Sequence, residues 1–204
     1  MKHLQLYLTA LFCGLLLSFT GIKPHTDTYT LNTDSSSMEW YAEKVTGKHN
    51  GTIRFSSGEF YNNHGNFTGN FVVDMNSIVN KDVESEEHKK KLEGHLKSED
   101  FFDVAKFPKA TFVLNSLTVL PAPTKDGYTH AAKGMLTIKD KTNEVTFYTS
   151  MRMQGNSIFA SGSGVIDRSK FDVKYGSKSF FEDIGDKAIY DEFTLKFGIV
   201  AAKH

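Results

Sequence analysis

The sequence has a single cysteine, Cys13, and it lies in the apolar segment at the N-terminus. The rest of the chain therefore has no disulfide, no thiol nucleophile and no cysteine-based metal site. The chain also lacks net charge, since 24 lysine and arginine residues balance 24 acidic residues. Without a basic patch or an acidic tail, nothing indicates a nucleic acid partner.

Sequence motifs of common enzyme mechanisms are absent too. There is no HExxH, no GxSxG and no glycine-rich phosphate loop, and no spacing of Ser, His and Asp selects a catalytic triad. Asp100 and Asp103 could do acid–base chemistry, although turn and capping roles are commoner for such residues. His88 and His95 could share a helix face and hold a metal with Glu84, although solvated helix residues are commoner. We therefore predict no catalytic residue, no metal, no cofactor and no enzymatic activity.

The sequence also lacks a hydrophobic run long enough to form a membrane-spanning helix. The longest run, Leu4 to Phe19, is shorter than the roughly 20 residues that a membrane-spanning helix needs. Its positive start and small terminal residues are typical of a secretory signal peptide, cut near Gly21. We expect a signal over residues 1–20, one domain over residues 21–204, and a periplasmic or secreted protein. An uncleaved anchor and lipidation of the cysteine are the alternatives.

Alternation of apolar and polar side chains dominates the remaining sequence, and this period predicts half-buried β-strands. Turn signals such as Asn50-Gly51 and residues 140–143 separate the strands. Gly162 and Gly164 indicate curvature or a bulge. The expected strands cover residues 27–32, 38–43, 52–56, 67–75, 109–115, 135–138, 144–151, 158–167 and 193–201. Because most connections are short, the sheet is predicted to be antiparallel.

One charged segment interrupts the strands. Glu84 to Lys97 is predicted to be a helix that only covers other elements, since its apolar stripe is narrow. Phe101 and Phe102 follow in an aromatic plug, and Pro108 separates this plug from the next strand. Closing the sheet removes its edges, so we predict a mainly β fold: an antiparallel eight-stranded barrel with a helical and aromatic cap. A two-sheet sandwich is the runner-up.

The segment HLKSEDFFDVAKFPKATF, which starts at His95, resembles the signature of the YceI-like family of periplasmic polyisoprenoid-binding proteins. Three further stretches agree in order and spacing: KGMLTI from Lys133, GSGVIDRSKFD ending at Asp172, and the last strand up to Lys203. The chain departs from the family where glycine is frequent, at Lys139-Asp140 and at Asp172, and both departures concern loop geometry.

The resemblance implies a lipocalin-like barrel around a long apolar pocket. Its expected partner is a long-chain lipid, such as an isoprenoid quinone, a polyprenyl phosphate or a fatty amide, bound for transport, storage or sequestration. A stress-response interaction module and a lipid-modifying enzyme are the alternative functions. Transient membrane contact and a homodimer stay open.

The candidate ligand contacts are the inward apolar residues, the plug and the arginine-containing motif. From the residues alone, simple core packing is the commoner fate of inward aromatic side chains, and it is the resemblance that favours ligand contact for several of them. The candidates are Trp40, Phe55, Phe71, Leu96, Phe101, Phe102, Phe112, Leu114, Leu136, Ile138, Phe147, Phe159, Arg168, Phe171 and Phe197. Arg168 has two competing roles: it binds a phosphate or quinone oxygen at the pocket mouth, or it pairs with Asp100 or Asp103 and pins the plug. We favour the second role.

Overall fold

Nine β-strands make up most of residues 26–203, the part of the chain that the computed structural model describes. They are β1 (Thr26–Leu31), β2 (Ser37–Lys44), β3 (Gly47–Asn63), β4 (Asn66–Asn80), β5 (Lys109–Val119), β6 (His130–Ile138), β7 (Lys141–Gln154), β8 (Ser157–Asp167) and β9 (Ile189–Lys203). The predicted signal peptide, residues 1–20, lies outside the described residues.

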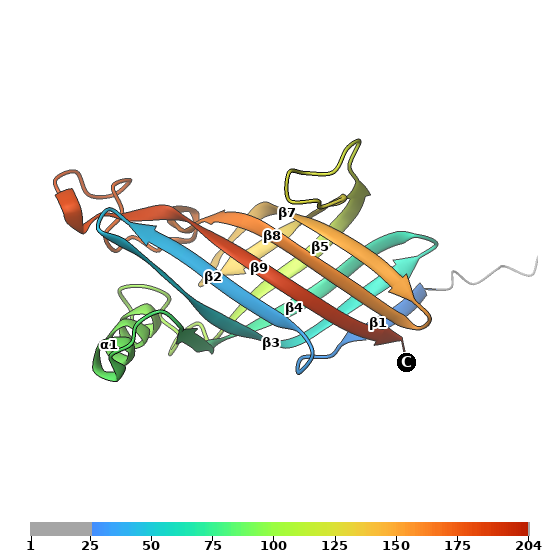
Figure 1. Cartoon of the computed structure of the whole chain (residues 1–204), viewed down its shortest axis with the longest axis horizontal. Coiled ribbons are helices and arrows are strands. Elements are labelled where there is room, and N and C mark those ends of the chain that lie inside the picture. Colours follow the sequence, from blue (N-terminus) through green and yellow to red (C-terminus); the bar gives the residue numbers. More distant parts are fainter. Residues whose placement is uncertain (1–25, 204) are drawn as a thin grey trace, which may run out of the picture.

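The sheet closes on itself because β3 to β9 pair in sequence order and β2 pairs with both β9 and β3 (Figure 1). Every neighbouring pair is antiparallel. β1 and β2 share one position around the barrel. β1 pairs with the end of β3 and the end of β9, whereas β2 pairs with the start of β3 and the first part of β9. The barrel therefore has eight strand positions, which confirms the predicted eight-stranded antiparallel barrel over the sandwich.

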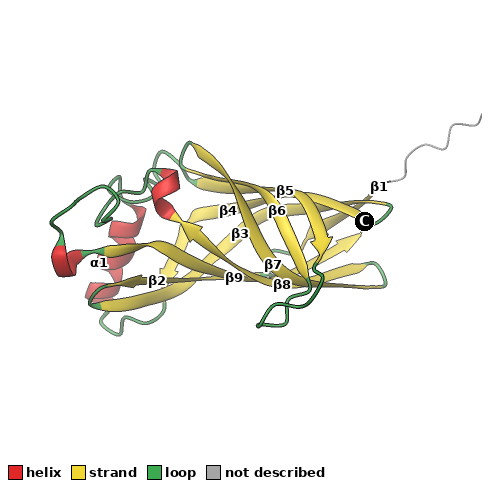
Figure 2. Ribbon diagram, turned by 90° about the horizontal axis from the view of Figure 1, so that it is seen from above, coloured by secondary structure: helices red, strands yellow, loops and turns green. Residues whose placement is uncertain are grey.

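The cap lies at one end of the barrel and the C-terminus at the other (Figures 1 and 2). It consists of helix α1 (Glu86–Lys97), the plug that follows it, and the loop between β8 and β9. Ser85 caps α1 by accepting a hydrogen bond from the backbone N–H of His88. No residue of α1 is buried, as expected of a helix that covers rather than fills. The β8–β9 loop contains two 3-10 turns, η1 (Arg168–Phe171) and η2 (Gly185–Lys187).

Two predicted turns are wrong in position. Asn50-Gly51 lies within β3, and the hairpin turn between β2 and β3 falls at Val45-Thr46. Gly51 is needed for packing instead, because a Cβ there would stand 1.9 Å from the Val79 carbonyl oxygen and 2.7 Å from the Trp40 ring. The turn expected at residues 140–143 falls at Lys139 and Asp140.

Gly162 and Gly164 serve packing rather than a bulge. β8 pairs with β9 in unbroken register from Ser157 to Asp167. A Cβ on Gly162 would stand 2.3 Å from the Phe197 ring, and one on Gly164 would stand 2.4 Å from the Phe147 ring. The two glycines therefore make room inside the barrel for aromatic rings of neighbouring strands.

The register of the sheet shifts elsewhere, at four places, and two of these shifts, in β3 and β5, bear on the cavity wall. The register shifts in β3 between Phe55 and Ser57, and in β5 between Leu114 and Ser116. A bulge changes which residues face inward beyond it. Phe55 and Phe60 are consequently both buried although they lie an odd number of positions apart.

Lys139 and Asp172, the positions where the resemblance would favour glycine, both adopt the left-handed conformation, with φ of 55° and 60°. This conformation is strained for residues with a Cβ. The backbone geometry that favours glycine is thus kept, although the glycines are not.

Candidate ligand-binding cavity

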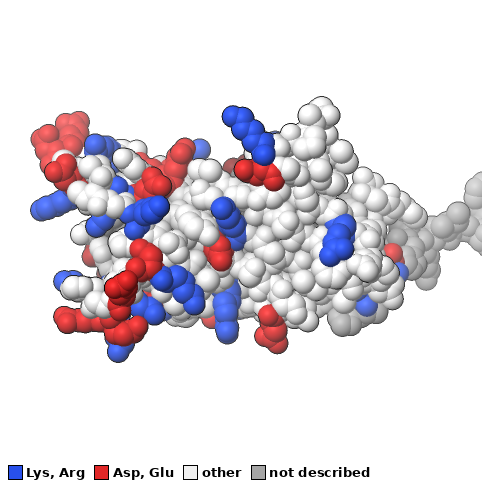
Figure 3. Space-filling model, viewed as in Figure 1, with Lys and Arg blue, Asp and Glu red and all other residues white. Residues whose placement is uncertain are grey.

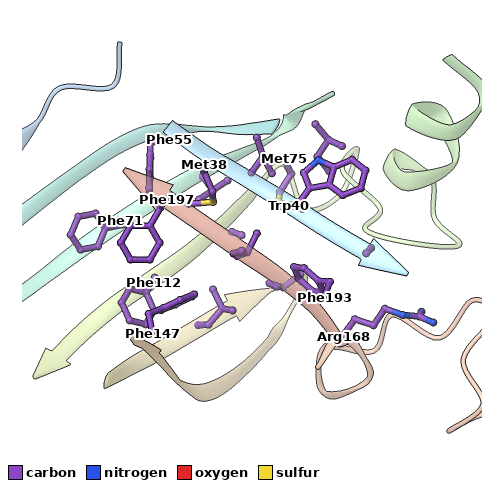
Figure 4. A pocket seen from close by; sticks show the side chains of 18 of the residues that line it. Met38, Trp40, Phe55, Phe71, Met75, Phe112, Phe147, Arg168, Phe193 and Phe197 are labelled. Carbon is purple, nitrogen blue, oxygen red and sulfur yellow. The ribbon is translucent and has the colours of Figure 1, made fainter. Parts of the chain in front are cut away.

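The barrel encloses an apolar cavity with a volume of about 230 Å³. Phenylalanines form its centre, with ring centroids 6.5 Å apart for Phe71 and Phe112, 5.2 Å for Phe112 and Phe147, and 5.7 Å for Phe147 and Phe197 (Figure 4). On β9 the wall runs from Ile189 to Ile199. Ten residue steps correspond to about 33 Å along a strand, so the wall is long enough to follow an extended chain.

Most predicted candidates lie in this wall. They are Trp40, Phe55, Phe71, Leu96, Phe101, Phe102, Phe112, Leu114, Leu136, Ile138, Phe147, Arg168 and Phe197. The cap contributes Leu96, Phe101 and Phe102, so the helix and plug cover the cavity at one end.

Phe159 and Phe171 do not line the cavity. In β8 the inward residues are Ile158, Ala160 and the glycines, and this places Phe159 on the outer face. There its ring lies 4.6 Å from the Arg152 guanidinium. Phe171 is buried at the end of η1, outside the cavity wall.

Several wall residues were not predicted. Met38, Phe193, Leu195 and Ile199 continue alternations that were recognised in β2 and β9, so the pattern contains a signal for them. Phe60 in β3 and Leu117 in β5 lie beyond bulges, where simple alternation fails. The remaining unpredicted wall residues are Ala42, Glu43, Lys44, His49, Ile53, Val73, Met75, Ile78, Leu92, His95, Ala110, Thr111, Ala132, Thr149, Met151, Ala160, Ile189 and Tyr190.

Arg168 lies in the wall near the cap and is 3% exposed. Its Nη1 donates to the Val173 carbonyl at 2.9 Å, its Nη2 to the Ile189 carbonyl at 3.0 Å, and its Nε to the Tyr190 carbonyl at 3.2 Å. The guanidinium also lies 5.4 Å from the centre of the Phe101 ring. Arg168 thus connects η1, the start of β9 and the plug.

The ion-pair partner of Arg168 is Asp191, at 3.4 Å, and not Asp100 or Asp103 as predicted. Asp100 is exposed to solvent, whereas Asp191 lies on β9 beside the carbonyls that Arg168 binds. Burial lowers the pKa of Arg168, and the charges of Asp191 and Asp167 act in the opposite direction. The geometry agrees with a pinning role, with a different acid as partner.

A polar cluster anchors α1 at the rim of the cavity. Asp82 accepts hydrogen bonds from His49 Nδ1 at 2.9 Å, from the Asn50 N–H at 2.9 Å and from Asn80 Nδ2 at 2.6 Å. Partial burial acts to raise the pKa of the Asp82 carboxyl, but these hydrogen bonds outweigh it and hold the pKa below its ordinary value. Glu93 of α1 accepts from the Asn80 N–H at 2.8 Å, which ties the helix to β4.

Within residues 26–203, no three His, Cys, Asp or Glu side chains come together as a metal site. The hypothetical group of Glu84, His88 and His95 therefore does not assemble. The His95 ring packs against Tyr175 instead, with centroids 4.4 Å apart. No helix in the same stretch is long and apolar enough to cross a membrane.

Comparison with known proteins agrees with this architecture. The model of the YceI-like domain matches residues 29–201. A UPF0312 protein of Yersinia enterocolitica is 30% identical over 104 residues, which cover 47% of this chain and 50% of that protein. A UPF0312 protein of Yersinia pestis is 29% identical over the same shares. The chain thus spans about half the length of the curated relatives it matches.

Two solved structures share the fold. BcnA of Burkholderia cenocepacia superposes with a TM-score of 0.64 at 23% identity, covering 84% of this chain and 99% of that one. A polyisoprenoid-binding domain of Saccharophagus degradans, described as implicated in plant cell wall breakdown, superposes with a TM-score of 0.58 at 14% identity, covering 86% of this chain and 98% of that one. Because the domain model matches residues 29–201, nearly all of the barrel, the chain belongs to the YceI-like family.

Proposed function

We propose that the protein binds one long-chain apolar amphiphile, such as an isoprenoid quinone or a fatty amide, inside the barrel. The observation that carries this proposal is the long apolar cavity with its row of phenylalanines. Side chains that merely filled a core would leave few voids larger than a water molecule. The polyisoprenoid-binding domain of Saccharophagus degradans has the same fold, which supports a lipid of this class.

Burial of the chain supplies the affinity. Each methylene group that leaves water contributes roughly 0.8 kcal/mol. A chain that follows the wall from the cap to the central phenylalanines can therefore bind without any ionic contact. The function that this supports is carriage or sequestration of the lipid without chemical change, so the bound lipid should have the same mass before and after incubation with the protein.

Exposed aromatic side chains in and next to the β8–β9 loop lie at the capped end and support lipid exchange with a membrane. Tyr175, Phe180 and Phe181 in the β8–β9 loop are all more than 40% exposed, and Tyr190 is both 49% exposed and part of the cavity wall. Charges of both signs gather over the same end of the molecule (Figure 3). We propose that lipid enters and leaves here, and that the signal over residues 1–20 exports the protein.

Two matched substitutions test the binding site. Phe112→Asp places a carboxylate in the cavity and should abolish binding of a fluorescent long-chain lipid analogue, because a buried charge without a partner is costly. Phe159→Asp places the same group on the outer face next to Arg152 and should leave binding unchanged. Equal affinity of both folded variants for the analogue would refute the cavity as the binding site.

A further inference from the structure

The indole N–H of Trp40 is a buried hydrogen-bond donor without a partner. Trp40 is 9% exposed and lies in the cavity wall, and its Nε1 atom has no acceptor. The buried Oδ1 atoms of Asp27 and Asp191 are acceptors rather than donors, and both belong to ion pairs, with Lys203 and Arg168. Trp40 therefore carries the one unpaired buried side-chain donor found in residues 26–203.

The fold makes specific room for this indole. Trp40 in β2 lies directly across from Gly51 in β3, and any Cβ on Gly51 would collide with the indole at 2.7 Å. A phenylalanine would fill much of the same space without burying an N–H group. Buried indole N–H groups usually find an acceptor, so an acceptor supplied by a ligand explains why a donor stands here.

The nearby cation is already engaged. Each nitrogen of Arg168 donates to a backbone carbonyl, and Asp191 lies beside the guanidinium. Lys44 lines the cavity only at its rim, at the end of β2 and four residues from Trp40. A phosphate beside the indole would therefore meet an arginine that is already engaged and would lie far from Lys44, whereas a neutral acceptor would meet the Trp40 donor.

The position of Trp40 determines how a ligand that accepts a hydrogen bond from it would lie. Trp40 lies four residues before Lys44, the last residue of β2 at the capped end, which is about 13 Å along the strand. Figure 4 shows the indole on the side of the cavity toward the cap, with Phe71, Phe112 and Phe147 on the opposite side. If the polar group of a ligand lies near Trp40, its apolar chain lies in the rest of the cavity, which phenylalanine side chains line.

We propose that Trp40 Nε1 donates a hydrogen bond to a neutral oxygen of the ligand, the carbonyl of a ketone, quinone, ester or amide. The cavity thereby selects uncharged carbonyl lipids over hydrocarbons of the same length and over lipid phosphates. This inference rests on the proposed function and specifies the polar group of the ligand.

Three probes of equal chain length test it: a long-chain methyl ketone, the corresponding alkane and the corresponding alkyl phosphate. Each displaces a fluorescent lipid analogue from the protein. The wild type should bind the ketone about tenfold more tightly than the alkane, the effect of one hydrogen bond to an otherwise unpaired buried donor. Trp40→Phe should bring the ratio of ketone affinity to alkane affinity close to one. Phe197→Leu removes part of the apolar wall but keeps the indole donor. It should weaken the binding of both probes and preserve the ratio of their affinities.

A second readout uses the wild type alone, since Trp40 is the only tryptophan of the chain. The ketone should shift the emission maximum to longer wavelength relative to the alkane, because it hydrogen-bonds the indole. An unchanged ketone-to-alkane ratio in Trp40→Phe, identical emission with both probes, or tighter binding of the phosphate would overturn the inference. If none of the probes binds, the proposed function fails with it; if all bind with equal affinity, only the role of Trp40 fails.

Discussion

Replacing Arg168 by alanine removes the guanidinium that connects η1 to the start of β9. Three backbone carbonyls lose their donors, and Asp191 loses its counter-charge. Removing one partner of a buried ion pair typically costs ~3–5 kcal/mol. The Asp191 side chain is 19% exposed and keeps a hydrogen bond from Ser179, so we expect the lower end of this range, about 3 kcal/mol.

For a protein of this size, each kcal/mol shifts Tm by about 2–4 °C. Arg168→Ala should therefore lower the Tm of the ligand-free protein by about 6–12 °C. Arg168→Lys should recover only part of the loss, because an ammonium group cannot reach three carbonyls with fixed planar geometry. Lys170→Ala is the matched control: its side chain is 63% exposed and 3.9 Å from Asp167, and such surface pairs contribute at most about 1 kcal/mol.

Thermal and urea unfolding, followed by circular dichroism, measure these differences. Lipid titrations on the same variants separate the two roles of Arg168. A pinning role predicts that affinities for neutral and anionic lipids fall by similar factors. If Arg168→Ala keeps the wild-type Tm and loses only the anionic lipid, Arg168 is a headgroup contact and the reasoning above is wrong.

Five further substitutions test the backbone, the glycine packing and the rim. Lys139→Gly and Asp172→Gly should each raise the free energy of unfolding by up to ~1 kcal/mol in urea titrations, because glycine adopts their left-handed φ without strain; a loss at both positions would contradict this. Gly51→Ala should lower the free energy of unfolding by ~2 kcal/mol or more, because its Cβ would collide with backbone atoms. Gly94→Ala in α1 has open space around it and should raise the free energy of unfolding by up to ~1 kcal/mol. Similar effects at both glycines would refute the packing argument. Asp82 has a folded-state pKa below its ordinary value of 3.8, so its carboxylate stabilises the fold above that pH, and this contribution is lost as pH falls through the folded pKa. Asp82→Asn should therefore be less stable at neutral pH and less sensitive to acid below about pH 4; an acid-unfolding profile that matches the wild type would argue against this role.

Periodicity predicted the parts of the fold that depend on local pattern. In β9 the alternation from Phe193 to Ala201 identified the inward face, and the charged sequence with few apolar positions identified α1 as a cover. Both features arise from whether successive side chains meet water or the barrel interior, which is visible in a single segment.

Features that depend on two or more segments escaped prediction. The glycine at position 51 is a strong turn signal locally, yet its role is set by the Trp40 ring on the neighbouring strand. Ile158 rather than Phe159 faces inward, since the same side of β8 carries the glycines that accommodate rings from β7 and β9. The partner of Arg168 is Asp191, which the fold brings near only through the long β8–β9 loop.

The most direct test of the central claim is mass spectrometry of organic extracts from the protein purified, without detergent, from its native host. The account predicts one lipid of fixed mass at close to one molecule per barrel, carrying a long apolar chain and a neutral carbonyl, and its loss from Phe112→Asp but not from Phe159→Asp. Native protein that yields no lipid, and binds none of the same lipids when they are added back, would contradict the account.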